Sequence, residues 1–306
     1  MSTHENTDNT KERGRSMSSQ TTHGGYYLPE PSHWPLVGSI GLFLTTGGFA
    51  YFLVHEGPSW VMLLGVAVII FMLFGWFGTV VRESLSGAYN DQVDRSFRMG
   101  MMWFIFSEVM FFAAFFGALF YIRMWAVPWL GGAGNNAMTH EWLYPAYTAQ
   151  WPTAGPAELG DGFTTMGAWG IPAINTLILL SSGVTVTWAH WGLKKGARGQ
   201  LILGLLATVA LGFLFLGLQA YEYVHAYTDL GLTLQDGAYG NTFFMLTGFH
   251  GMHVTIGAIM LTVIMLRAMA GHFSEHNHFA FEAAAWYWHF VDVVWLGLFI
   301  FVYWLV

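Results

Sequence analysis

The chain has 306 residues, of which 55% are hydrophobic and only 9% are charged, and its formal net charge at pH 7 is −7. Soluble domains carry about 25% charged residues, so most of this surface is not built to face water. The sequence has no cysteine, which excludes disulfides, thiolate metal sites and cysteine nucleophiles. The acidic balance argues against a nucleic-acid partner.

The amino-terminal segment is polar and has no apolar run. Residues 1–30 are rich in Ser, Thr, Asn and His, and a cleavable signal peptide would need an apolar core. We therefore predict a mobile tail here, with Met17 as an alternative start, followed by a single membrane domain over 31–306.

Seven long apolar blocks follow the tail. They span 34–55, 60–81, 98–122, 167–190, 200–225, 241–268 and 279–305. Each can cross a hydrocarbon core of about 30 Å as a helix, which takes about 20 residues. Because the blocks lack the alternation of barrel strands, the sequence predicts an all-α polytopic membrane protein with seven transmembrane helices.

The positive residues predict the orientation of these helices. Of the 11 Lys and Arg residues, only Arg123 lies on the opposite side from the others. Those on the common side are Lys11, Arg13, Arg15, Arg82, Arg95, Arg98, Lys194, Lys195, Arg198 and Arg267. The positive-inside rule then places the amino terminus and these residues on the inner side, and the carboxyl terminus and the long loop 123–166 outside.

One carboxyl group lies deep in the third predicted helix. Glu108 comes ten residues after Arg98, which is a depth of about 15 Å at a rise of about 1.5 Å per residue. Burial among Phe and Met favours the protonated acid. One interpretation is proton handling or a reactive carboxyl, and the other is a neutral acid that is hydrogen-bonded to another helix or to a lipid group.

The last two predicted helices carry a second set of ionisable residues. His250 and His253 lie one turn apart, as do His289 and Asp292, and the two helices are sequential and antiparallel. These four groups can meet at similar depth, with Glu282 on the same face nearer the inner surface. A metal site is one interpretation, but a redox centre needs more imidazoles from converging helices. We expect a structural polar cluster that holds the two helices together, and no metal site.

Other polar residues lie at the ends of predicted helices. Arg82 and Arg267 end theirs at the inner interface, where they suit anionic phospholipid headgroups or serve only as topological anchors. Glu222 and His225 lie at the outer end of the fifth, where we expect water or headgroups to reach them.

Five strings carry a resemblance to a known family. They are SEVMFFAAFF at 107–116, INTLILLSSGVTVTWAHW at 174–191, QAYEY at 219–223, YGNTFFMLTGFHGMHV at 239–254 and HFAFEAAAWYWHFVDVVW at 278–295. From about Trp34 to its end, the chain resembles subunit III of haem–copper cytochrome c oxidases of the mitochondrial and proteobacterial type. It departs from the family's usual Ser-Pro-Trp-Pro entry to the first helix, which reads Ser32-His33-Trp34-Pro35, and from its Trp-Trp pair, where Phe77 follows Trp76.

The resemblance implies an accessory subunit of an aerobic respiratory oxidase that takes electrons from cytochrome c, reduces dioxygen and pumps protons. The chain would carry no redox centre, since haems and copper belong to partner subunits I and II, and it would support proton uptake and turnover stability of subunit I. Two of its helices would be separated from the other five by a V-shaped cleft that holds structural phospholipids. We expect it in a bacterial inner (plasma) membrane, with a cytoplasmic amino terminus and a periplasmic carboxyl terminus.

The resemblance also assigns residues. Glu108 matches the family's carbodiimide-reactive carboxylate, and Arg82 and Arg267 match positions that bind phospholipid headgroups. Three alternatives stay open at this point: a similar chain of a quinol or nitric oxide reductase, a proton transporter, and a His-ligated membrane metalloenzyme.

Overall fold

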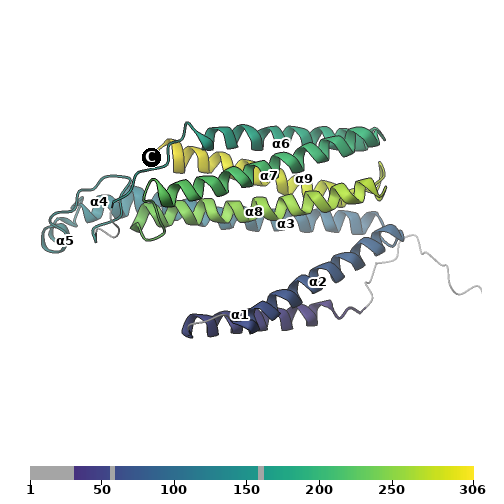
Figure 1. Ribbon diagram of the computed structural model, residues 1–306, viewed down its shortest axis with the longest axis horizontal. Coiled ribbons are helices and arrows are strands. Elements are labelled where there is room, and N and C mark those ends of the chain that lie inside the picture. The colour runs from purple at the N-terminus through teal and green to yellow at the C-terminus, as the bar shows by residue number, and fades with distance from the viewer. Residues whose placement is uncertain (1–30, 56–58, 158–161) are drawn as a thin grey trace, which may run out of the picture. The chain divides into compact units, whose positions relative to one another are not determined.

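The computed structural model describes residues 31–55, 59–157 and 162–306, and the regular structure in these ranges is entirely helical (Figure 1). Within these ranges, seven helices are long and apolar enough to cross a membrane. They are α1 (Trp34–Val54), α2 (Trp60–Leu85), α3 (Asp91–Tyr121), α6 (Ile171–Lys194), α7 (Arg198–Thr228), α8 (Gly237–Met269) and α9 (Phe279–Leu298). The prediction of an all-α protein with seven spans is confirmed, whereas the tail over 1–30 and Met17 lie outside the described residues.

Short elements extend two of the spans. A π-helical turn, η1 (Ile122–Ala126), and α4 (Val127–Leu130) continue α3, and a second one, η2 (Phe299–Trp304), continues α9. A further short helix, α5 (Ala137–Leu143), lies in the connection to α6.

Several predicted helix ends were wrong by a turn or more. The third helix begins at Asp91 rather than 98, because Asn90 caps it through Val93 N–H and two aspartates in its first turn favour a helix amino terminus. The fourth covers Ile171–Lys194 rather than 167–190, with Pro172 in its first turn. Apolar blocks mark the hydrocarbon core, and these helices continue beyond it. Arg82 and Arg98 are therefore inside helices.

The chain divides into two compact units, one up to Arg95 and the other from Ser96 to Val306. In the first, α1 and α2 form a hairpin whose close crossing depends on glycines. A Cβ atom at Gly48 would overlap the backbone of Met62, and one at Gly65 would overlap Thr45. Small residues at such crossings let two helices approach closely in lipid.

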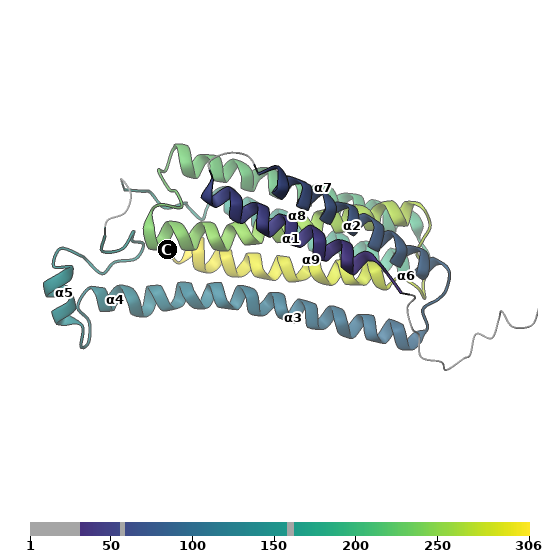
Figure 2. The ribbon, with the colours of Figure 1, turned by 90° about the horizontal axis from the view of Figure 1, so that it is seen from below.

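The second unit contains α6 to α9 and α3 from Ser96 onward, and α3 runs alongside α9 (Figure 2). Aromatic rings of α3 contact α8 and α9. Trp288 of α9 is fully buried at the centre of this unit. Its indole fits between Gly212 of α7 and Gly257 of α8, where a Cβ atom would lie 2.8 Å from the ring. The indole N–H donates to Ser182 Oγ of α6 at 2.8 Å. This one side chain thus connects four helices.

Replacing this tryptophan tests the packing. Trp288→Phe removes the N–H donor, leaves Ser182 Oγ without it, and opens a void, so the free energy of unfolding should fall by about 2 kcal/mol. Unfolding in mixed micelles of increasing SDS fraction measures this change. Trp191→Phe is the matched control, since Trp191 is 57% exposed. Equal stabilities of the two variants would contradict the assigned role of Trp288.

Candidate functional site

Glu108 of α3 is in contact with α8. Its Oε2 lies 2.8 Å from Nε2 of His253, and the Glu108 and His253 side chains are 21% and 6% exposed. Phe111 and Phe112 pack their rings near the imidazole. Among these apolar groups the carboxyl has a polar partner from a helix that is distant in the sequence.

The hydrogen bonds of His253 determine how many protons this pair holds. Its Nδ1 lies 2.6 Å from the carbonyl oxygen of Phe249. A carbonyl oxygen only accepts, so Nδ1 carries the hydrogen, and Nε2 of a neutral imidazole is then an acceptor. A carboxylate is also an acceptor. The 2.8 Å contact therefore needs one proton, either on Glu108 or on His253, and the pair as a whole is electrically neutral.

His250 makes a different contact. Its Nε2 lies 3.2 Å from the carbonyl oxygen of Val291 in α9, and its ring packs near Phe215 and Trp295. Its Nδ1 has no hydrogen-bond partner among the residues of the structure's described ranges. His250 thus joins α8 to the backbone of α9, as a neutral ring in an apolar setting.

His289 and Asp292 face α6 rather than α8. His289 Nε2 lies 3.2 Å from Thr187 Oγ1, and its Nδ1 lies 3.6 Å from Asp292 Oδ2. Asp292 lies against Gly183, where an added Cβ would be 2.5 Å from Oδ2. The expected single cluster of His250, His253, His289 and Asp292 is therefore not formed. Spacing predicts depth in the membrane, but it does not predict how each helix is rotated about its axis.

Glu282 also lies apart from His289. It forms an ion pair with Arg98 of α3, and its Oε1 lies 3.4 Å from Nε2 of His190 in α6 and 3.3 Å from that of His278. This group joins α3, α6 and α9 at their predicted inner ends. His190 and His278 were not predicted as members of this group, although the i, i+4 spacing of His278 and Glu282 indicates a contact between them.

One group in the described ranges has the geometry of a metal site, and it consists of His190, His278 and Glu282. The ligand atoms of these three residues lie within 4.8 Å of one another. The guanidinium of Arg98, paired with Glu282, already places a positive charge there. We interpret the group as an ionic anchor between helices.

Glu222 is more buried than predicted. It is fully buried at the end of α7, where Tyr303 of η2 donates to its Oε1 at 2.6 Å. The expectation that water or headgroups reach it was wrong, because the π-helical turn covers it. His225 is the exposed member of the pair and contacts Asp229.

Arg82 and Arg267 belong to different units. Arg82 is exposed on α2 and bonds within its own helix, to Gly78 O and Thr79 Oγ1 at 3.3 Å. Arg267 lies in the last turn of α8, with its guanidinium 4.8 Å above the ring of Phe273. The Arg82 side chain is exposed, whereas Arg267 is half-buried and its Nε has no hydrogen-bond partner in the described ranges.

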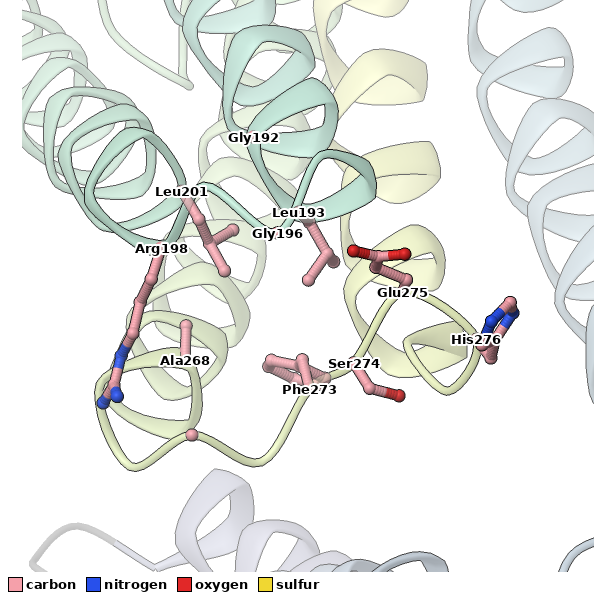
Figure 3. A pocket seen from close by; sticks show the side chains of 11 residues that line it. Gly192, Leu193, Gly196, Arg198, Leu201, Ala268, Phe273, Ser274, Glu275 and His276 are labelled. Atoms are coloured by element: carbon pink, nitrogen blue, oxygen red, sulfur yellow. The ribbon is translucent and has the colours of Figure 1, made fainter.

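Two surface pockets lie in the second unit. One, of about 500 Å³, lies between the α6–α7 turn and the α8–α9 loop, with Arg198 and Glu275 on opposite sides of it (Figure 3). It contains none of the predicted site residues, and Arg198 Nη2 already donates to Met269 O at 2.6 Å. The other, of about 730 Å³, is a largely apolar groove between α6 and α9, and His289 and Asp292 lie in its wall.

The sequence of this helix bundle matches a known protein family. The sequence profile of the family described as Cytochrome c oxidase subunit III matches residues 24–306. The chain belongs to the cytochrome c oxidase subunit III family. As a subunit III it is a multi-pass membrane protein, an accessory subunit of the oxidase, and works in a complex with other oxidase subunits.

Similar proteins carry the same family name. "Cytochrome c oxidase subunit 3" of Gadus morhua is 41% identical over 280 residues, which are 91% of this chain and 96% of that protein. The protein of the same name from Marchantia polymorpha is 43% identical over 281 residues, with the same two shares. The resemblance stated from the five strings is thus confirmed. Neither the reductase and transporter alternatives nor the metalloenzyme are supported by these matches.

Proposed function

We propose that this subunit III flanks subunit I in a respiratory cytochrome c oxidase, carries no redox centre, and supports proton uptake and turnover stability of subunit I. Subunits I and II are its partners, and cytochrome c is the electron donor of the complex. The observation that carries the proposal is the Glu108–His253 pair, which needs one proton in an apolar setting and leaves Glu108 partly accessible from the membrane. Haems and copper belong to the partners.

The proposed location is a bacterial plasma membrane, with the amino terminus in the cytoplasm and the carboxyl terminus in the periplasm. The distribution of Lys and Arg supports this orientation. The inner mitochondrial membrane is the alternative, since the relatives reported above come from eukaryotes.

Spectroscopy of the purified complex tests the accessory role. The tagged chain is purified in mild detergent, its co-purifying proteins are identified, and a reduced-minus-oxidised visible spectrum is recorded. Haem bands should appear with subunits I and II and vanish when the chain is stripped from them. Haem or stoichiometric metal retained by the stripped chain would contradict the proposal and make the histidines of α8 and α9 candidate ligands.

We further propose that Arg82 and Arg267 each bind phospholipid headgroups. A guanidinium at the membrane interface attracts an anionic phosphate, and each such contact near the surface contributes about 1 kcal/mol. The double variant Arg82→Ala/Arg267→Ala should therefore lower the amount of phospholipid that co-purifies with the complex, as measured by phosphate analysis. Arg123→Ala, which removes a positive charge elsewhere in the chain, is the control. Unchanged lipid content would leave the two arginines as topological anchors.

A further inference from the structure

The groove between α6 and α9 has polar groups at the middle of the membrane. His289 and Asp292 lie on either side of the midpoint of the span Phe279–Trp304, and Gly183 lies at the middle of Ile171–Lys194. The two helices lie side by side (Figure 1), and these residues line the groove together. Hydrocarbon chains offer no hydrogen bonds at this depth, so exposed polar groups there are costly.

His289 is unusually exposed for such a position. Its side chain is 45% exposed, whereas those of Glu108 and His253, also deep in the five-helix unit, are 21% and 6% exposed. Exposed positions at similar depth on other faces are apolar, such as Leu214 of α7 and Ile256 of α8, or carry a small hydroxyl that bonds within its own helix, such as Thr255. The groove therefore differs from the faces that suit lipid.

The hydrogen bonds in the groove are incomplete. Thr187 Oγ1 donates to Gly183 O at 2.9 Å, so it accepts from Nε2–H of His289. Nδ1 of the neutral ring is then an acceptor, and it lies 3.6 Å from Asp292 Oδ2, beyond hydrogen-bond distance. Asp292 is 6% exposed, and its Oδ1 has no hydrogen-bond partner in the parts of the chain that the structure describes. Asp292 Oδ1 is buried, so the acceptor that the wall of the groove exposes is Nδ1 of His289.

We propose that the α6–α9 groove is the docking surface for a transmembrane helix of another oxidase subunit, which places a hydrogen-bond donor against the exposed ring of His289. The exposed Val184 and Val293 on the rims of the groove provide apolar contact. The donor would be a hydroxyl, amide or guanidinium side chain. The proposal rests on the proposed function, since it requires partner subunits, and it identifies the face that they cover.

Photocrosslinking in the assembled oxidase tests this surface. The photoreactive residue p-benzoylphenylalanine is incorporated at Val184 or Val293, which are 70% and 67% exposed, and as controls at Leu214 or Ile256, which are 50% and 43% exposed. After irradiation in the native membrane, the two groove positions should give several-fold more adduct with another oxidase subunit than the controls. Adducts with phospholipid alone, or with residues 34–85 of the same chain, would overturn the proposal.

A bulky substitution provides a second measurement. Val184→Trp fills the groove without replacing a buried residue, so the chain should be lost from the complex at a several-fold lower detergent concentration than the parent, and Leu214→Trp should not change its retention. Equal retention of the two variants would overturn the docking surface. The proposed function is tested separately, since it fails if the unmodified chain does not co-purify with the haem-bearing subunits or if the stripped chain retains haem or metal.

Discussion

Replacing Glu108 with Gln is expected to remove one protonated carboxyl group from the infrared spectrum of the complex and to abolish carbodiimide labelling of this chain. The carboxyl of Glu108 makes no other polar contact in the described ranges than that with Nε2 of His253, and Nδ1–H of this histidine donates to Phe249 O. The pair must hold one proton, and an apolar setting favours the neutral acid with a neutral imidazole over two opposite charges. Carbodiimides react with protonated carboxyl groups, so the same state accounts for both results.

The control for this measurement is Glu141→Gln. Glu141 is exposed on α5, outside the seven spans, and its replacement should leave both the band and the labelling unchanged. If Glu108→Gln instead removes a carboxylate band, the shared proton belongs to His253, and the expectation of a neutral acid is wrong. Labelling that persists in Glu108→Gln would mean that another carboxyl group reacts.

The spans and the depth of Glu108 could be predicted because they follow from the thickness of the membrane. A helix must cover about 30 Å of hydrocarbon, so seven apolar blocks predict seven spans, and a residue's distance from the nearest charge gives its depth. Helix ends were less predictable, because the helices extend into the headgroup region, where residues such as Asp91 and Lys194 are tolerated.

The partners of the buried polar groups could not be predicted in the same way. Sequential helices were expected to be neighbours, and His250 does contact α9. Glu108, however, contacts His253 of α8, which follows α3 only after two other spans. Depth also gives no rotation about a helix axis, which is why His289 faces Thr187 of α6 instead of the histidines of α8.

A second large effect is expected at the ionic anchor. Arg98→Met leaves Glu282, whose side chain is 10% exposed, without its guanidinium partner. Removing one partner of a buried ion pair costs about 3–5 kcal/mol, but the Arg98 side chain is 32% exposed and solvent weakens the pair. We expect the free energy of unfolding to fall by about 2 kcal/mol, measured by SDS titration in mixed micelles. Arg95→Met, which removes an exposed positive charge from the same helix, should have little effect.

The double variant Arg98→Met/Glu282→Met shows whether the loss of stability comes from the unpaired charge of Glu282 or from lost packing contacts. Two apolar side chains leave no buried charge, so the double variant should be more stable than Arg98→Met alone and approach the parent. This recovery is expected because the loss in the single variant comes from stranding a carboxylate rather than from losing contacts. A double variant that loses the sum of the two single effects would show that Arg98 and Glu282 stabilise the bundle independently. Replacing Glu282 also removes the carboxylate that His190 and His278 both contact. The contact between α6 and the start of α9 should therefore weaken in the double variant, whichever of the two results is found.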